Sequence, residues 1–228
     1  MPYAQGLELQ EQLVSARKAG TIGDTLLLLE HPAVITLGRN AKQQNIVASP
    51  EELARRGVEL FECNRGGDVT YHGPGQLVGY PIFNILQMQP KLGAVDFVRR
   101  IEEVLIRSCT DFGIATHRVK GMTGVWTDPA TARHESKIAA LGIHISRGVT
   151  SHGFALNVNT DLTHFQLIVP CGIADKPVTS IARELGRDVD SDSVAQSVAR
   201  QFSSVLNSQM LWLDSIDKLL PRTATVRA

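Results

Sequence analysis

The sequence has little cysteine, and what it has is scattered. Only three cysteines occur, Cys63, Cys109 and Cys171, and no two of them form a CxxC pair. This odd set argues against a disulfide framework and against a zinc site held by thiolates. The seven histidines include no HExxH motif. We therefore expect no metal and no other cofactor.

Net charge and long apolar runs are also missing. Lys plus Arg and Asp plus Glu both number 23, so no global field recruits nucleic acid or an anionic membrane. No apolar run reaches the roughly 18 residues that span a bilayer. The start, MPYAQ, has neither a basic region nor the apolar core of a secretion signal. We expect a soluble cytoplasmic monomer without nucleic-acid or membrane partners.

The length and composition favour one domain. A chain of 228 residues with 43% hydrophobic side chains can bury one sizeable core. No internal repeat, low-complexity linker or change in composition divides it. We therefore expect a single domain over residues 1–228.

Apolar spacing predicts helices alternating with short strands. Helices are expected over residues 6–18, about 94–112, 177–185 and 193–206, with a short one opening at Pro50. Gly20 and Gly186 are expected to end helices, and Asp192 to cap the last one. Residues 25–30 and 33–37 are expected to form two strands, or one strand broken at Pro32, and a further strand is expected over residues 58–61. The tail offers only residues 210–213, which could dock as a short strand or helix.

A change to alternation of period two predicts a β-hairpin over residues 141–158, with its turn at Arg147-Gly148. Together these elements predict an α+β (mixed α/β) domain, a β-rich sheet with helices packed on it.

One segment, residues 65–81, carries five glycines in seventeen positions. It matches neither the phosphate loop GxxxxGK[ST] nor the dinucleotide motif GxGxxG. Two interpretations stay open. The glycines could serve a tight turn between strands, or they could let main-chain N–H groups line a pocket in which Arg65, Tyr71 and His72 orient a ligand.

Cys171 is the candidate nucleophile, because it lies between Pro170 and Gly172 after an apolar run and so at an expected exposed strand end. Cys63 and Cys109 are better explained as packing thiols. A thiol of pKa about 8.5 needs a neighbouring cation or base to be reactive at neutral pH. The sequence offers four candidates for that neighbour: Lys137, His72, His144 and His152.

The role of each candidate stays open from pattern alone. Lys137 begins an apolar strand, where it is either a solvent-facing gatekeeper or a desolvated functional amine. His144 has the phase of the polar face. His152 shares the phase of Phe154 and Leu156 and should point inward, either as a functional group or as a satisfied interior histidine.

Four separated motifs resemble one known family. They are RGGDVTYHGPGQL at 65–77, SKIAALG at 136–142, SHGFALNVN at 151–159 and VPCGI at 169–173. In this order they resemble the bacterial octanoyltransferases of lipoate biosynthesis, over about residues 25–185. The resemblance implies a fold similar to the catalytic domain of biotin and lipoate protein ligases, a mixed, largely antiparallel sheet flanked by helices.

The resemblance also implies an activity. Octanoyl-acyl carrier protein would donate its acyl group to Cys171 as a thioester, and the target lysine of a lipoyl domain would then receive it, the first step of endogenous protein lipoylation. Lys137 matches the family's dyad lysine and would act as general base. The implied acceptors are the lipoyl domains of 2-oxoacid dehydrogenase complexes and the glycine cleavage H protein.

Small side chains in the matching segments would make room for the acyl chain. Burial at about 0.8 kcal/mol per methylene could contribute up to roughly 5 kcal/mol and so select chain length. The substrate-contacting residues that the resemblance implies are Arg65, Gly66, Gly67, Asp68, Val69, Thr70, Tyr71, His72, Ala140, Leu141, Gly142, Gly153, Phe154 and Ala155, with His152 in support.

Three rival functions remain. An ATP-dependent lipoate or biotin ligase shares the fold and a related glycine-rich segment but needs no nucleophilic cysteine. An idle acyl-binding or carrier-docking module would form no thioester. A cysteine hydrolase would lose the acyl group to water unless the site excluded it.

Overall fold

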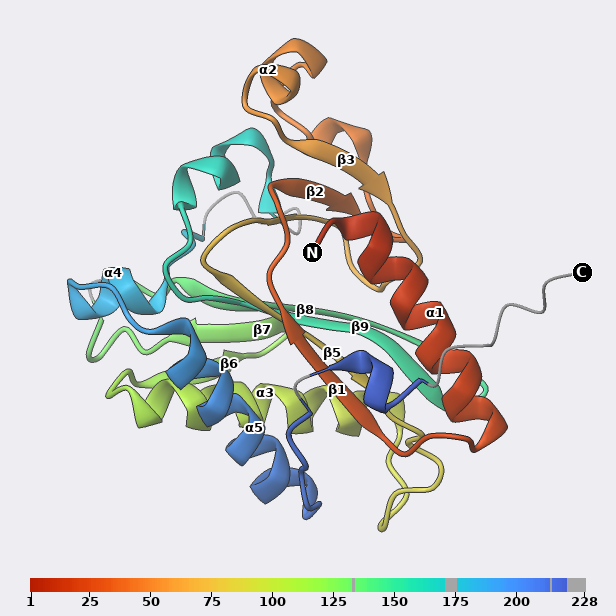
Figure 1. Ribbon diagram of the computed structural model, residues 1–228. Coiled ribbons are helices and arrows are strands. Elements are labelled where there is room, and N and C mark those ends of the chain that lie inside the picture. Colours follow the sequence, from red (N-terminus) through yellow and green to blue (C-terminus); the bar gives the residue numbers. More distant parts are fainter. Residues whose placement is uncertain (133, 171–175, 214, 221–228) are drawn as a thin grey trace, which may run out of the picture.

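The structure, a computed structural model, describes residues 1–132, 134–170, 176–213 and 215–220. Its larger sheet has six strands in the order β1-β5-β9-β8-β7-β6, and every neighbouring pair is antiparallel (Figure 1). The strands are β1 (Thr25–Leu29), β5 (Gln76–Ile82), β6 (Thr116–Val119), β7 (Met122–Thr127), β8 (Lys137–Ser146) and β9 (Val149–Asn157).

The predicted hairpin is confirmed as β8 and β9. The two strands pair from Ala139↔Leu156 to Ser146↔Val149. Arg147 and Gly148, at the turn, have φ values of 51° and 81°. Positive φ at both central residues is the signature of the primed turns that match the twist of a hairpin.

A smaller sheet has three strands in the order β3-β2-β4. They are β2 (Val34–Leu37), β3 (Glu59–Glu62) and β4 (Val69–His72), and β2 is parallel to β3 but antiparallel to β4. Short helices accompany this sheet: η1 (Gln43–Asn45), α2 (Pro50–Arg55) and η2 (Leu162–Leu167). Of the two interpretations of residues 25–37, two separate strands is therefore confirmed and one broken strand is wrong, because β1 and β2 belong to different sheets.

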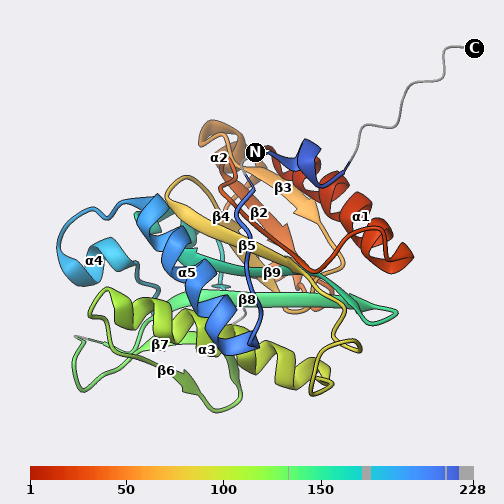
Figure 2. The same ribbon diagram turned by 60° about the horizontal axis from the view of Figure 1, so that its bottom comes forward.

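Helices cover both faces of the larger sheet (Figures 1 and 2). On one face, α3 (Ala94–Asp111) and α5 (Ser191–Leu206) pack together, and their apolar side chains meet those of the sheet. On the other face lies α1 (Tyr3–Ala19), whose Leu13 packs with Val78 and Tyr80 of β5. The expected α+β class with a largely antiparallel sheet is therefore confirmed. The helices predicted over residues 6–18 and 94–112 are confirmed as α1 and α3, and the helix predicted over residues 193–206 is confirmed as α5 apart from its start.

Two predicted helix starts are wrong. α4 covers only Ile181–Leu185 and is capped by Ser180, because the residues before it pair with β8 through Lys137↔Val178 instead. The cap of α5 is Asp190 rather than Asp192, since the Asp190 carboxylate accepts the Ser193 N–H at 3.0 Å. Gly186 does end α4, in the left-handed conformation at φ 67°.

The tail segment at residues 210–213 forms neither a strand nor a helix. Leu211 and Trp212 are exposed, whereas Met210 packs against the main core, so the segment docks through Met210 alone without forming a strand or helix. Among the residues described, no helix has the length and apolar character needed to cross a bilayer.

Candidate active site

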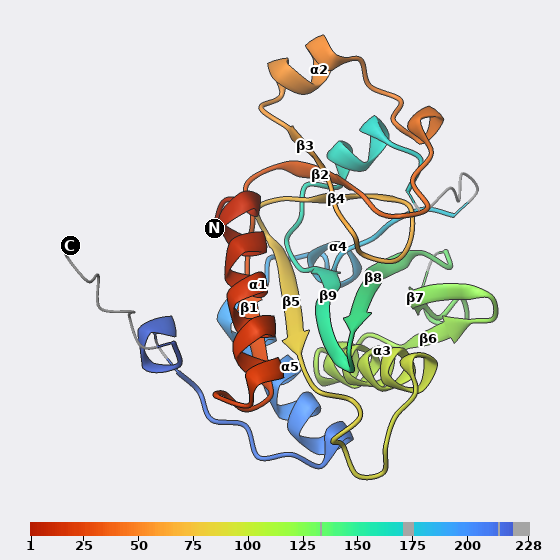
Figure 3. The same cartoon turned by 90° about the vertical axis from the view of Figure 1, so that its right-hand side faces the viewer.

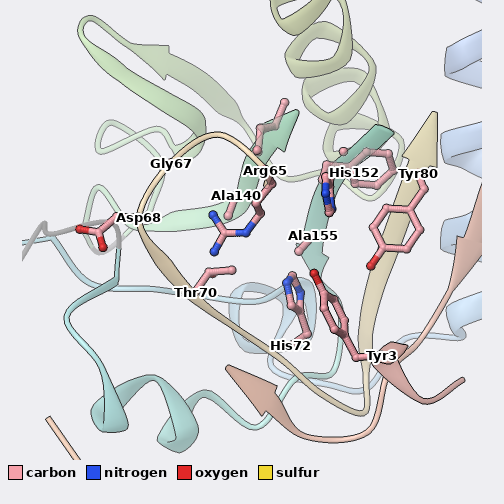
Figure 4. Close-up of a pocket in the computed structure, with 14 residues that line it drawn as sticks. Tyr3, Arg65, Gly67, Asp68, Thr70, His72, Tyr80, Ala140, His152 and Ala155 are labelled. Carbon is pink, nitrogen blue, oxygen red and sulfur yellow. The ribbon is translucent and has the colours of Figure 1, made fainter. Parts of the chain in front are cut away.

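A cavity lies between the two sheets, on the face of the larger sheet that α1 also covers (Figure 4). Figure 3 shows the smaller sheet above the larger one, with α1 running beside β5. Its wall combines segments from across the chain: the start of α1, the glycine-rich segment, β4, β5, β8 and β9. The lining residues are Tyr3, Arg65, Gly67, Asp68, Thr70, His72, Tyr80, Ala140, Leu141, Gly142, His152, Gly153, Phe154 and Ala155.

Glycines let the backbones of this wall approach closely. Gly66 donates its N–H to Ile143 O at 3.1 Å. A Cβ added at Gly142 would lie 2.6 Å from Gly66 O, and one at Gly153 would lie 2.1 Å from Gly79 O. Neither position could carry a side chain without moving main chain. The glycine-rich segment therefore serves close backbone approach beside a cavity as well as the turn from β4 to β5.

The structure brings most of the expected contact residues together and leaves three aside. Eleven of the fourteen line the cavity, as does His152, whereas Gly66, Val69 and Tyr71 do not. For Val69 and Tyr71 the reason is alternation along β4, because Thr70 and His72 face the cavity while Val69 and Tyr71 join the core of the smaller sheet. Tyr71 stacks on His164 at 4.9 Å between ring centroids, so it is placed to pack rather than to orient a ligand.

The two cavity histidines are held neutral at physiological pH. Burial, followed by the nearby Arg65 cation, lowers the pKa of His72 to about 3 and that of His152 to about 4. His72 Nδ1 donates to Gln76 Oε1 at 2.8 Å, since the Gln76 amide nitrogen itself donates to Tyr71 O and Asn157 Oδ1. His152 Nε2 lies 2.7 Å from Asn64 Oδ1, an acceptor that fixes the proton on Nε2.

Arg65 supplies a fixed positive charge in the cavity wall. Its side chain is 8% exposed, and its guanidinium donates to Thr36 O at 2.7 Å and to Gly66 O at 3.0 Å. Within the described ranges no carboxylate lies at ion-pair distance from it. The Asp68 carboxylate instead accepts the N–H groups of Lys42 and Val69. The wall can therefore stabilise a polar or partly negative oxygen of a bound ligand.

Helix α1 contributes to the site in a way that the sequence did not reveal. Tyr3 is 2% exposed and stacks on His72 with 6.2 Å between ring centroids. Gln10 Oε1 accepts the backbone N–H of His152 at 2.7 Å, and His152 adopts φ 55°, a strained value for a residue other than glycine. Local pattern carries no signal for these contacts, which depend on packing over long sequence distances.

Lys137 lies at a second cavity that shares wall with the first. Thr70, Ala140 and Ala155 line both cavities. Lys137 is the first residue of β8 and is 6% exposed, so it is a buried amine and not a solvent-facing gatekeeper. Its Nζ lies 4.8 Å from the centroid of the Trp126 ring.

Cys171, the predicted nucleophile, lies outside the described residues. The chain on each side of residues 171–175 comes to Lys137. Pro170 lines the same cavity as Lys137, and Pro177 O accepts the Lys137 N–H at 2.8 Å. Thr179 N–H donates to Lys137 O at 2.9 Å. The described residues Pro170, Pro177 and Thr179, which flank residues 171–175 in the sequence, therefore lie beside the buried amine.

The surroundings of the remaining candidates, Cys109, Cys63 and His144, fit structural roles. Cys109 is fully buried, and burial raises the pKa of its thiol to about 12. Cys63 Sγ lies 3.4 Å from Leu37 O. His144 is half-buried and lines neither cavity. In the part of the chain that the structure describes, no group of three or more His, Cys, Asp or Glu side chains could hold a metal ion.

Comparison with known proteins places the chain in a family. Residues 2–203 match the lipoyl protein ligase A/B catalytic domain. The chain belongs to this family. It is 62% identical to an octanoyltransferase of Koribacter versatilis over 96% of the chain and 86% of that protein. It is 60% identical to an octanoyltransferase of Acidobacterium capsulatum over 98% of the chain and 94% of that protein. The expected octanoyltransferase family is therefore confirmed.

Solved structures show the same fold. A lipoate-protein ligase A bound with ATP superposes with a TM-score of 0.70 at 18% identity, covering 92% of this chain and 87% of that one. A bipartite lipoate protein ligase of Thermoplasma acidophilum gives a TM-score of 0.69 at 16% identity, covering 92% and 85%. The expected likeness to the ligase catalytic domain is confirmed at the level of fold.

Proposed function

We propose that this octanoyltransferase carries its acyl group as a thioester on Cys171, with Lys137 as general base. The observation that carries the proposal is the burial of Lys137 in a cavity that shares lining residues with the larger one. Pro170 and Pro177, which flank Cys171 in the sequence, lie beside this lysine. A buried amine beside a thiol supplies what a catalytic cysteine needs, a partner that takes its proton.

The reaction proceeds in two half-reactions. Lys137 takes the Cys171 proton, and the thiolate attacks the carbonyl carbon of octanoyl-acyl carrier protein. The bond between the acyl carbon and the carrier sulfur breaks, and the carrier thiol leaves with the proton from Lys137. The acceptor lysine then attacks the Cys171 thioester as a neutral amine and passes its proton through Lys137 to the departing Cys171 sulfur. An amide forms and the enzyme is restored.

The larger cavity holds the octanoyl chain. Small residues of β8 and β9, Ala140, Gly142, Gly153 and Ala155, leave the space, and the neutral histidines add no charge that would compete with Arg65. Burial of the chain at about 0.8 kcal/mol per methylene then favours medium-length acyl groups over short ones.

The acceptor is a lipoyl domain, in keeping with the family. We propose the lipoyl domains of 2-oxoacid dehydrogenase complexes and the glycine cleavage H protein as the specific acceptors, and octanoyl-acyl carrier protein as the donor. We also propose that residues 1–228 act as one catalytic domain in a cytoplasmic monomer. Support for a single domain comes from the cavity wall, which takes residues from both sheets and from α1.

A transfer assay without ATP tests this proposal. Wild type should octanoylate an apo lipoyl domain from octanoyl-acyl carrier protein at a rate that added ATP does not change. Cys171→Ser and Lys137→Ala should each lower that rate by about 1000-fold or more, because either change removes the activated nucleophile. The matched control Cys63→Ala should retain it.

Other outcomes favour the rival functions. A strict ATP requirement with unimpaired Cys171→Ser would indicate a ligase. Release of free octanoate in place of transfer would indicate a hydrolase. Donor binding without transfer in wild type would indicate an acyl-binding module.

A further inference from the structure

We propose that Trp126 is a positioning residue for Lys137, and that the face of its indole ring holds the ammonium group of Lys137 at the cavity. This inference deepens the proposed function, since it rests on Lys137 acting in the transfer. Trp126 lines neither cavity, so it is not needed to bury the octanoyl chain, and the inference gives this aromatic residue a separate role.

The two residues face each other across neighbouring strands. Trp126 of β7 pairs with Lys137 of β8, and the Lys137 Nζ lies 4.8 Å from the ring centroid. Trp126 is 1% exposed and Lys137 is 6% exposed. An ammonium within about 6 Å of an indole face is attracted by the ring, and the attraction is largest where both partners are desolvated.

Gly124 on β7 leaves room for the side chain of Lys137. A Cβ added at Gly124 would lie 3.1 Å from Lys137 Cε and 2.9 Å from Ala139 O. Gly124 has φ 137°, a conformation that favours glycine. Its N–H donates to Glu102 Oε1 at 3.0 Å, and Glu102 is fully buried and paired with Arg99. The strand beside the lysine stem is thereby held in place.

The backbone of Lys137 is fixed as well. Its N–H and C=O are both bonded to the segment that follows residues 171–175, through Pro177 O and Thr179 N–H. With the backbone fixed, the Trp126 ring contacts the far end of the four-carbon side chain. An aromatic face attracts a cation and leaves its charge in place for a thiolate partner.

Two substitutions separate the ring face from simple packing. Trp126→Phe keeps an aromatic face, and Trp126→Leu keeps an apolar side chain without one. The indole Nε1–H is buried and has no hydrogen-bond partner among the described residues, so neither change breaks a hydrogen bond there. Phe97→Leu is the matched control, because Phe97 is a fully buried aromatic on α3, in the core between that helix and the sheet.

We expect Trp126→Leu to lower kcat for octanoyl transfer by about 10- to 30-fold with KM for the donor within about twofold, since the ring acts on the reacting group and not on binding. Trp126→Phe should stay within about threefold of wild type, and Phe97→Leu within about twofold per folded molecule. An unchanged kcat in Trp126→Leu, or a raised KM alone, would overturn the inference.

A spectroscopic measurement serves if Trp126→Leu does not fold. The chain has two tryptophans, so Trp212→Phe leaves Trp126 as the sole emitter. In that background Lys137→Met should change the emission of Trp126, whereas Lys120→Met on the exposed surface should not. Unchanged emission would overturn the inference. Full transfer activity in Lys137→Ala, measured alongside, would instead overturn the proposed function, so the two failures are distinguishable.

Discussion

The two faces of the β8–β9 hairpin differ in the size of the side chains they present. On the face toward α3 and α5, Ala139 pairs with Leu156 and both are buried in the main core. One step along the ladder, Ala140 pairs with Ala155, and both line the two cavities. Neighbouring residue pairs of the two strands therefore have different roles. The Ala139–Leu156 pair packs in the core and stabilises the domain, whereas the Ala140–Ala155 pair leaves space in the cavities.

This difference indicates that stability and acyl binding can be altered separately, because period-two alternation sends adjacent residues to opposite faces. A change on the core face should lower the free energy of unfolding without altering selectivity. A change on the cavity face should alter selectivity at little cost in stability.

Leu156→Ala should have the largest effect. The side chain is fully buried in the core, so its truncation should lower the free energy of unfolding by about 2–5 kcal/mol. Urea unfolding followed by circular dichroism measures this. The rate of octanoyl transfer per folded molecule should stay within about twofold, and a selective loss of octanoyl transfer would show that the two faces are not independent.

Ala140→Leu should act on the cavity face. Leucine adds three carbons at a position that lines both cavities, which displaces about three methylenes of acyl chain and should lower kcat/KM for the octanoyl donor by about 100-fold. Transfer from a butanoyl donor should fall far less. Competition between donors of different length measures the ratio, and an equal loss for both lengths would count against an acyl chain in this cavity.

The buried histidines should make stability depend on pH. His152 has a pKa of about 4 when folded against 6.5 for a free histidine, so the unfolded chain binds the proton first as pH falls. Its contribution is present above pH 6.5 and is lost between pH 6.5 and 4, at up to about 1.4 kcal/mol per pH unit. His72 should act in the same direction.

Urea unfolding between pH 7 and 5 checks this dependence. His152→Gln should show a shallower fall than wild type over that range. Buried carboxylates lose their contribution only at lower pH, so they do not account for a difference there. Parallel slopes in the two proteins would contradict the neutral state of His152.

The smallest effect is expected at the two cysteines other than Cys171. Cys109 is fully buried, with a pKa of about 12, and Cys63 is half-buried against Leu37 O. Cys63→Ala with Cys109→Ala should leave transfer within about twofold and lower the free energy of unfolding by about 1–2 kcal/mol. Iodoacetamide should label Cys171 well before Cys109, as peptide mapping would show.

Much of the fold could be predicted from local pattern. Alternation predicted the hairpin, and the positive φ of Arg147 and Gly148 matches the expected turn. The cap of α5 was misplaced because Asp190 and Asp192 are both suitable capping residues, and only the backbone geometry decides between them. Motif resemblance placed Lys137 in the site, but its burial and its contact with Trp126 depend on how β7 and β8 pair.

The site was predicted less completely, since a cavity wall is assembled by tertiary packing. Tyr3 and Gln10 lie before the first motif, and nothing in their neighbours along the chain indicates contact with His72 or His152. Tyr71 was expected to contact the ligand because it lies within a conspicuous motif. Alternation along β4 sends it to the core of the smaller sheet, and that phase becomes clear only once Thr70 is seen to face the cavity.

The most direct test of the central claim is a single-turnover chase. Stoichiometric octanoyl-acyl carrier protein is mixed with enzyme without ATP, the protein is isolated, and its intact mass and peptides are measured before and after addition of an apo lipoyl domain. The account predicts one octanoyl group on Cys171 that disappears as the lipoyl domain gains it. Transfer with no acyl-enzyme at any time, or an adduct that the lipoyl domain cannot discharge, would contradict it.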